Sequence, residues 1–495
     1  MKLYKNITIK KASIYLTASL IAVTGCKKSF LDVPPQGQPP ATAFWITADD
    51  ATRGVNSLYA NMRTWTEVAF APIAIESLGS DDTETGSDPS DGSVPFMNTY
   101  NNFTVTSTQG QIADFWNGKY HQIELCNQVL DNVPNITMDN SLKARYVAEA
   151  KFIRAYTYFR LVRAFGDVPL RLHLPKDANE FNIPRTPKAQ VYAAIEQDLT
   201  EAAGVLPQSY SGQENIGRAT KGAALAMHAK VCMYQAKWAE VLNYTNQVMS
   251  LGYALVPNFE KEFREVNENS SESIFEIQAE LVPGNGDASN SQYSQVQGVR
   301  GVTGGGWGFN IPTKALADSF EPGDPRRDAT IIFRGETTPE GDPIPESVPN
   351  AFYNQKSYVP FSEYQSGFNE GCQQNIRVMR FAEVLLMNAE AANEQGDAVT
   401  ALASLEKVRA RARGGNPAIL PKITTTDKGA LRLAIWEERH HELAMEFDRY
   451  FDVIRQGRAK EIFGPLGWKD RNVVWPLPQA EIDLSSGKLV QNAGY

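Results

Sequence analysis

The sequence predicts a mainly α-helical protein in which repeated helix pairs pack against a loop-rich, irregular half with a few short strands. Three observations support this fold class. Apolar residues recur at helical spacing over much of 41–254 and again from 376 to about 458. Glycine, proline, asparagine and serine are dense in 255–375, where the helical period fades. An internal repeat at an offset of 160 residues links the two helical regions.

The N-terminus is typical of a secretory signal. Several lysines precede an apolar run from Ala12 to Val23, and the small residues Thr24 and Gly25 stand before Cys26. The run is shorter than the about 20 apolar residues that a membrane span needs. The segment VTGC resembles a bacterial lipobox, which implies cleavage before Cys26 and lipid on its sulfur and new amino group. A plain signal peptide with an incidental cysteine is the alternative.

The first elements after the signal follow from local residue types. Residues 1–25 are predicted to be a lipoprotein signal peptide that is removed, and 26–40 an extended linker, because proline fixes φ and removes backbone donors. A helix is expected near Thr47, which can cap its N-terminus, with two aspartates in the first turn. Residues 79–110 are expected to form a long polar loop.

The next elements are helices, and one helix pair among them occurs a second time later in the chain. Helices are expected at 112–132, 142–165, 187–204, 218–236 and 237–250. Five residues of 227–248 recur in 387–408, and each copy has one helix, a tight turn at Ala236 or Gly396, and a second helix that returns antiparallel. Helix pairs of about 34 residues with small residues at the crossing are similar to tetratricopeptide repeats.

The remaining chain divides into two regions. Within 255–375, Ser273–Gln278 alternates like a short strand and Trp307 stands between glycines. After residue 376 the pattern is helical again and ends in an extended, proline-bearing tail. We therefore expect three regions in the body of the protein: 41–254 helical with repeats, 255–375 loop-rich, and 376–495 helical with a tail.

Composition and cysteine spacing exclude some classes of protein. The net charge is −9, and no lysine or arginine block is long enough for nucleic acid, whose phosphate backbone requires clustered cations. No apolar run of membrane length follows the signal, which predicts a tethered body outside the bilayer. Cys126, Cys232 and Cys372 are far apart, so buried free thiols are expected, with one disulfide as the alternative.

Metal and cofactor motifs are missing from the sequence. The His440-His441-Glu442 segment fails as an H-E-x-x-H zinc motif because residue 445 is methionine. The other histidines are scattered, so no metal site built on histidine is expected. The acidic loop that starts at Asp81 could hold Ca²⁺, but it lacks the twelve-residue calcium-loop spacing. We expect a solvated loop there and no cofactor.

A run of charges near the C-terminus could suggest catalysis. Arg439, Glu442, Glu446 and Arg449 are spaced by three or four residues, which predicts one helix face on which opposite charges pair. We therefore expect a structural ion network that clamps the last helices, and no catalytic residue.

Three C-terminal blocks carry a recognisable pattern. They are RFAEVLLMNAEAANEQGDAVTALASLEKVRARA (380–412), EERHHELAMEFDRYFDVIRQGRA (437–459) and WPLPQAEIDLSSGKLVQNAGY (475–495). Together they resemble the signature of the SusD/RagB family of outer-membrane nutrient-binding lipoproteins. Three features depart from the family pattern: Ala493 stands where proline is usual, Leu484-Ser485-Ser486 replaces the usual Asn-Pro, and no acidic run follows Cys26.

The resemblance implies both an architecture and a role. It implies a tetratricopeptide-like helical superhelix packed against an irregular half that carries the ligand site. It also implies a lipid-anchored, outward-facing protein of the outer membrane that captures a nutrient oligomer, a glycan or else a peptide. The implied partner is a SusC-like, TonB-dependent β-barrel transporter that the lipoprotein covers like a lid. No enzymatic activity is expected; the alternatives are a protein-binding repeat scaffold and a lipid-anchored glycoside hydrolase.

Candidate ligand contacts follow from the chemistry of sugar binding, which combines flat apolar faces with hydrogen-bonding groups. Tryptophan and tyrosine supply both. Trp116 lies in a predicted helix and is assigned to the core. The loop-borne candidates are Trp65, Phe96, Tyr100, Tyr293 and Trp307, with Asp81, Asp82 and Asn101 as polar neighbours.

Overall fold

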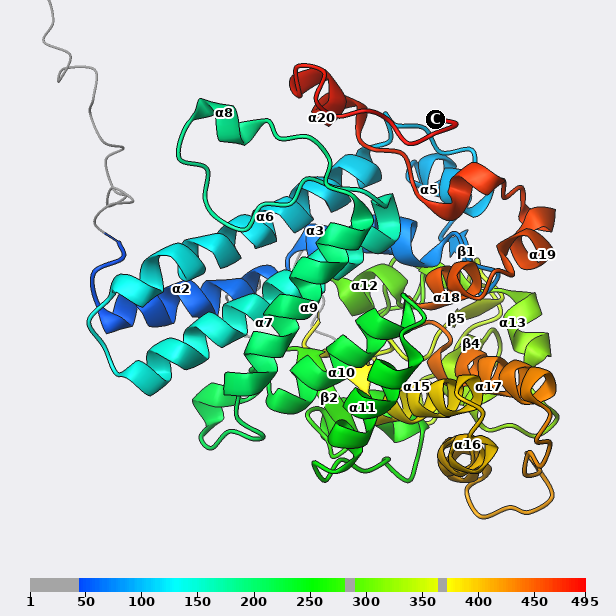
Figure 1. The fold of residues 1–495 in the computed structure, drawn as a ribbon. Coiled ribbons are helices and arrows are strands. Elements are labelled where there is room, and N and C mark those ends of the chain that lie inside the picture. The colour runs from blue at the N-terminus through cyan, green and yellow to red at the C-terminus, as the bar shows by residue number, and fades with distance from the viewer. Residues whose placement is uncertain (1–43, 281–289, 364–371) are drawn as a thin grey trace, which may run out of the picture.

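The fold is taken from a computed structural model that describes residues 44–280, 290–363 and 372–495. The predicted signal peptide at 1–25, the lipidation site Cys26 and the linker at 26–40 lie outside the described residues. Most of the described chain is helical, as the sequence predicts (Figure 1). None of the helices in these three ranges combines the length and the apolarity needed to cross a membrane.

The N-terminal region is a layer of long helices (Figure 1). Its first helix begins where the sequence predicts, because Thr47 Oγ1 accepts a hydrogen bond from Asp50 N (3.2 Å) and Asp50 Oδ2 accepts one from Thr47 N (2.8 Å). The long helices of this layer are α2 (Ala48–Asn61), α6 (Gly110–Asn132), α7 (Asn140–Phe165) and α9 (Lys188–Val205).

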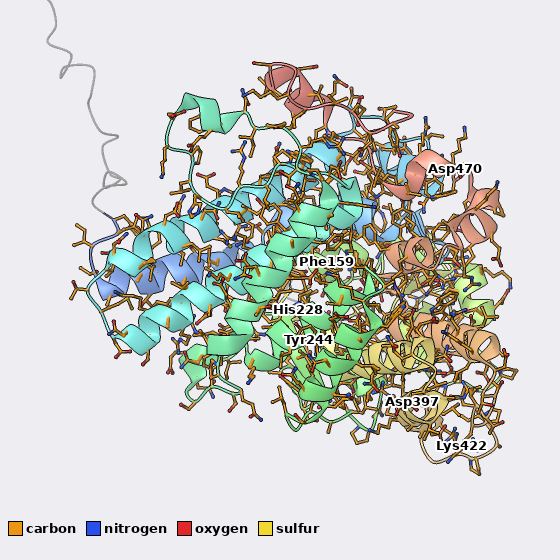
Figure 2. The ribbon with its side chains drawn as sticks, viewed as in Figure 1. Phe159, His228, Tyr244, Asp397, Lys422 and Asp470 are labelled. Carbon is orange, nitrogen blue, oxygen red and sulfur yellow. The ribbon has the colours of Figure 1, made fainter. Side chains whose placement is uncertain are left out.

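The predicted repeat is present as two helix pairs. The pairs are α10 (Lys221–Met233) with α11 (Trp238–Met249), and α15 (Phe381–Glu394) with α16 (Ala398–Arg413). The connecting turns match as well, since Ala236 (φ 54°) and Gly396 (φ 85°) both take the left-handed conformation that ends a helix sharply. Helix α11 packs against α15, so the two repeats form one continuous helical surface (Figures 1 and 2).

Short antiparallel strand pairs tie the irregular half to the helices. Two of the pairs join strands that are far apart in the sequence, as in the register Glu84↔Ile311 and Glu276↔Arg377. Through these pairs the three predicted regions are joined into one structure. The pairs are β1 (Thr83–Gly86) with β3 (Phe309–Pro312), β2 (Ser273–Ile277) with β6 (Ile376–Arg380), and β4 (Ile331–Phe333) with β5 (Phe352–Asn354).

Two expectations about local structure are corrected. The predicted polar loop at 79–110 contains strand β1 and helix α5 (Val94–Asn101), because Thr83, Thr85, Met97 and Tyr100 are buried. The chain from 376 begins as strand β6 before helix α15, because pairing with β2 satisfies its backbone. The predicted strand at Ser273–Gln278 is confirmed as β2.

The short elements complete the chain. Helix α17 (Lys428–Leu443) follows the second repeated helix pair. The others are α3 (Trp65–Val68), α4 (Phe70–Pro72), the π-helix η3 (Ile73–Ser77), α8 (Ala178–Phe181), α12 (Tyr293–Gln297), α13 (Lys314–Ser319), α14 (Arg326–Thr330), α18 (Arg449–Arg455), α19 (Ala459–Phe463) and α20 (Gln479–Leu484).

One main hydrophobic core extends through both halves. It joins Val55 of α2, Phe152 of α7 and Leu385 of α15 to Trp475 in the C-terminal tail, and all four side chains are fully buried. Trp116 is also buried, as predicted. The three predicted free thiols, Cys126, Cys232 and Cys372, are buried and unpaired. The continuous core keeps the irregular half rigidly attached to the repeats.

Candidate functional site

A cluster of partly exposed aromatic side chains lies where the irregular half meets the helical layer. Trp65, Phe70, Phe96 and Trp307 each pack on the core with part of the ring in solvent. The ring centroids of Trp65 and Trp307 are 5.9 Å apart and their planes are tilted by 51°. Phe70 lies 6.2 Å from Trp307 and 6.4 Å from Phe96. We call these four residues the open cluster.

Backbone geometry and a buried ion pair position the first two rings. Ala69 leaves the helical conformation (φ −100°, ψ −130°), so Trp65 on α3 and Phe70 on α4 meet at 5.3 Å instead of following one helix. Helix α3 is held by Glu67, whose carboxylate pairs with Lys119 of α6 and with Arg160 of α7 (3.1 Å). Burial of these charges makes the pairing costly to break, which fixes the Trp65 ring.

A glycine-rich turn positions Trp307. Trp307 N donates to Gln295 O (2.8 Å) and Gly306 N donates to Val299 O (2.8 Å), so the turn lies directly against the end of α12. A Cβ atom on Gly306 would lie only 2.2 Å from Gln295 O, which explains why this position requires glycine. The glycines therefore serve close backbone packing beneath the indole.

An arginine joins the Trp307 turn to the loop before α5. Arg300 Nη1 donates to Asp91 Oδ2 (2.9 Å), to Ser87 Oγ (2.8 Å) and to Trp307 O (3.2 Å). Ser87 Oγ also donates to Trp307 O (3.0 Å). Burial would raise the pKa of Asp91, but hydrogen bonds from Ser93 and the charge of Arg300 outweigh it and lower the pKa. The carboxylate is therefore ionised near neutral pH, and the rim of the cluster is polar.

Three of the five predicted aromatic residues, Trp65, Phe96 and Trp307, lie in the open cluster. Tyr100 does not, because its side chain is fully buried and packs edge-on against Trp475 at 5.7 Å. Tyr293 is 8% exposed, lies 6.0 Å from Phe447 and lines a partly open pocket of about 70 Å³. Both tyrosines are interior in this structure.

The three predicted polar neighbours form internal bonds. The Asn101 amide donates to Leu78 O (2.7 Å) and Thr83 O (2.9 Å), which fixes the turn before β1. Asp81 accepts two hydrogen bonds from Arg449, both 2.8 Å, and Asp82 pairs with His440 (2.6 Å). Burial raises the pKa of Asp81, but Arg449 outweighs this and lowers it. The start of the expected solvated loop is therefore bonded to the C-terminal helices through Asp81 and Asp82, whereas Glu84 farther along the loop is exposed.

Phe70 is the fourth ring of the open cluster, and the sequence did not predict it. Phe70 contacts Trp65, Phe96 and Trp307, and lies 4.8 Å from the buried Phe309. It connects the exposed rings to the core. Its only signal in the sequence was its position five residues after Trp65, in a segment with no clear helical period.

The predicted charge run forms buried ion pairs, but its geometry differs from the expected single helix face. Helix α17 ends at Leu443, and Met445 (φ 67°) and Phe447 (φ 68°) turn the chain, so Glu446 and Arg449 lie outside it. The four residues therefore pair with other elements and not with one another. The pairs are Arg439 with Glu383 and Asp452, Glu442 with Arg326, Arg380 and Arg411, Glu446 with Lys356 and Arg380, and Arg449 with Asp81.

Burial and neighbouring charges determine the ionisation state of Glu442 in this network. Glu442 is fully buried, and burial alone would raise its pKa, but Arg411, Arg380 and Arg326 outweigh burial and lower the pKa to about 2. Glu442 is thus a permanent anion that joins β6, α14, α16 and α17. The Glu442 carboxylate therefore stays ionised near neutral pH.

Fold and site together define a class of protein. The body is a helical repeat, and an open aromatic surface with a polar rim lies where the irregular half meets the helices. Such a surface binds ligands by stacking and hydrogen bonding.

Comparison with known proteins identifies the family. Residues 271–467 match the SusD family model, and residues 29–233 match the family described as "Starch-binding associating with outer membrane". SusD-like protein P2 of Formosa agariphila is 30% identical over 517 aligned residues, which cover 98% of this chain and 100% of the relative. The chain belongs to the SusD family.

Solved structures agree with this assignment. A laminarin-binding SusD-like protein is 30% identical, with a TM-score of 0.79 over 91% of this chain and 100% of that one. Surface glycan-binding protein A from Bacteroides thetaiotaomicron, solved with laminarihexaose, has a TM-score of 0.75, covering 90% of this chain and 99% of its own. At 24% identity, the latter shows a shared fold.

Proposed function

We propose that this chain is a lipid-anchored outer-membrane protein that captures a glycan at the open cluster and delivers it to a TonB-dependent β-barrel transporter. The observation that carries this proposal is the open cluster itself, in a chain 30% identical to a laminarin-binding SusD-like protein. Laminarin oligosaccharides are therefore the first ligands to test.

The geometry of the open cluster suits a sugar chain. Sugar rings have apolar faces that stack on aromatic rings and hydroxyl edges that form hydrogen bonds. The 51° tilt between Trp65 and Trp307 makes a curved surface, which favours a curved chain over a flat one. At the polar rim, Arg300 pairs with Asp91 and holds the turn that carries the Trp307 indole, which keeps this ring in place for stacking.

The surroundings of the open cluster favour binding without cleavage. Glycoside hydrolysis uses two carboxyl groups about 5–9.5 Å apart across the scissile bond. The two acids placed beside the open cluster by the contacts above are Glu67 and Asp91. Glu67 is buried in pairs with Lys119 and Arg160, and Asp91 is paired with Arg300. Neither is poised as a general acid.

Calorimetry tests the binding proposal. We expect the purified protein to bind laminarin oligosaccharides with one site per chain and to release no shorter products on prolonged incubation. Maltooligosaccharides in a parallel titration distinguish a β-glucan site from a starch site. Trp238→Ala on α11 is the control variant, because Trp238 is also partly buried but lies in the helical repeat. Absence of binding across a broad glycan panel, or release of products, would overturn the proposal.

Labelling and purification test the anchor and the partner. We expect metabolic labelling with palmitate to mark the wild-type protein and to leave Cys26→Ser unmarked. We also expect a large TonB-dependent receptor to co-purify from gently solubilised outer membranes. An unmarked wild-type protein would contradict the proposed lipid anchor. Purification without a receptor would contradict the proposed delivery to a transporter. Neither result would contradict glycan binding.

A further inference from the structure

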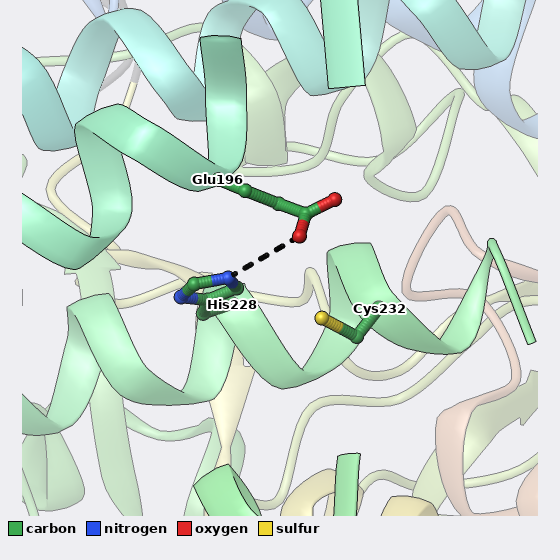
Figure 3. Close-up of side chains that lie close together, drawn as sticks. All are labelled: Glu196, His228 and Cys232. Carbon is green, nitrogen blue, oxygen red and sulfur yellow. Dashed lines mark ion pairs between the residues drawn. The ribbon is translucent and has the colours of Figure 1, made fainter. Parts of the chain in front are cut away.

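The junction between α9 and α10 brings together three side chains that sequence spacing did not connect. His228 and Cys232 are four residues apart on α10 and therefore share one helix face, which faces Glu196 of α9. One nitrogen, one sulfur and one carboxylate oxygen from these residues lie within 4.8 Å of one another. Figure 3 shows the sulfur of Cys232 and the carboxylate of Glu196 directed toward the His228 ring.

The imidazole of His228 is a buried polar group whose hydrogen-bonding capacity is unmet. Its side chain is 3% exposed, and its face stacks on Tyr244 with centroids 4.0 Å apart (Figure 2). Nδ1 has no hydrogen-bond partner, and Nε2 lies 3.9 Å from Glu196 Oε2, beyond hydrogen-bonding distance. Nε2 is the ring nitrogen that faces Glu196, and an ion bound between them would give this nitrogen the partner that it lacks.

We propose that Glu196, His228 and Cys232 form a binding site for a divalent transition-metal ion of the zinc type. Imidazole nitrogen, thiolate sulfur and carboxylate oxygen are the ligands that zinc takes in proteins, and three protein ligands leave a fourth position for solvent. The site is independent of the open cluster and of the proposed glycan binding.

The surroundings fit such an ion. Lys237 Nζ (2.6 Å) and Gln235 Nε2 (2.8 Å) both donate to Glu196 Oε1, which holds the carboxylate and directs Oε2 at His228. Orientation of a ligand by a second group is usual at metal sites. Glu196 is 22% exposed, so an ion can enter from solvent.

The spacing requires a small contraction. Ligand atoms bound tetrahedrally at about 2.0–2.3 Å from zinc lie about 3.3–3.8 Å apart. The present spread of up to 4.8 Å is wider than this, so the proposal requires the side chains to close on the ion when it binds. The thiol of Cys232 releases its proton to solvent when the metal binds, and the ion then joins α9 to α10.

Cobalt is the probe that tests this site, because a thiolate ligand gives Co²⁺ an intense charge-transfer band. We expect the metal-free, tag-free full chain to bind one Co²⁺ with that band and with the visible bands of a tetrahedral site, and zinc to displace it. We also expect zinc to raise Tm, because a ligand bound to the folded state stabilises it.

Matched variants decide the outcome. Cys232→Ser is expected to abolish the charge-transfer band, and His228→Gln to weaken Co²⁺ binding at least about tenfold. Cys126→Ser, at an equally buried thiol on α6, is expected to change neither. Circular dichroism and Tm of each metal-free variant establish that it is folded. Absence of the band in the wild type, or a band that survives Cys232→Ser, would overturn the proposal.

Discussion

Two aromatic clusters of similar composition lie on opposite sides of the boundary between core and surface. In the closed cluster of Tyr100, Phe103, Tyr450 and Trp475, each side chain is at most 3% exposed, and Phe103 stacks on Trp475 within 11° of parallel. In the open cluster around Trp307, neighbouring ring planes are tilted by 51° to 74° relative to one another, and each ring is partly exposed. The same residue types thus build either a core or a site, and exposure is what separates them.

The largest expected effect is on the closed cluster. Trp475 is fully buried, and its indole N–H donates to Ile75 O (3.0 Å), so Trp475→Ala leaves a large cavity and an unpaired carbonyl. We expect a loss of about 3–5 kcal/mol in the free energy of unfolding, measured by denaturant titration. If Trp475→Ala keeps its stability but no longer binds glycan, Trp475 belongs to the ligand site, and the two clusters do not divide into core and site.

The buried ion network adds a second stability test. Glu442→Gln removes the anion shared by Arg326, Arg380 and Arg411, and breaking such a buried pairing costs about 3–5 kcal/mol. Because the folded pKa is lowered to about 2 from 4.5, this stabilisation is fully present above pH 4.5 and is lost as the pH falls toward 2. Denaturant titrations at pH 7 and pH 3 should therefore differ less for Glu442→Gln than for the wild type.

The control for the network is ligand binding. Glu442 lies outside the open cluster, so any Glu442→Gln protein that remains folded should bind glycan as the wild type does. Loss of binding by a folded variant of undiminished stability would show a functional role for the charge run.

Substitution in the open cluster should reduce glycan affinity and leave stability nearly unchanged. Trp307→Ala removes a partly exposed ring, so we expect a small change in Tm and at least a tenfold loss of glycan affinity, or about 1.4 kcal/mol. Calorimetry and thermal melting on the same sample measure both. Trp307→Phe, which keeps an aromatic face, should retain part of the affinity. If Trp307→Ala binds as tightly as the wild type, the ligand site lies elsewhere.

Local sequence patterns predicted the elements but not the exposure of individual rings. The Thr47 cap and the matching turns at Ala236 and Gly396 were predictable because neighbours in the chain determine them. Trp65 and Tyr100 gave equal signals in the sequence. Their different burial depends on the pairing of β1 with β3 and on packing of the tail, which are contacts between distant segments.

The same reason explains the other differences. Glu442 and Glu446 follow a helical spacing, yet positive φ angles at Met445 and Phe447 end the helix between them, and nothing in the spacing indicates this. The proximity of Glu196 to His228 depends on how α9 packs against α10. Sequence spacing within one helix is informative, whereas proximity across helices becomes visible only in the fold.

The smallest expected effect is on the Arg300–Asp91 ion pair, which holds the turn that carries Trp307. Arg300 and Asp91 hold the turn that carries the indole, but the pair is partly exposed (30% and 21%), so each contributes little to stability. We expect Arg300→Gln and Asp91→Asn each to lower glycan affinity a few-fold, because the ring becomes less ordered before binding. In a double-mutant cycle, the double variant should lose little more than either single variant, since both act through one link. Fully additive losses would instead show that Arg300 and Asp91 contact the glycan separately.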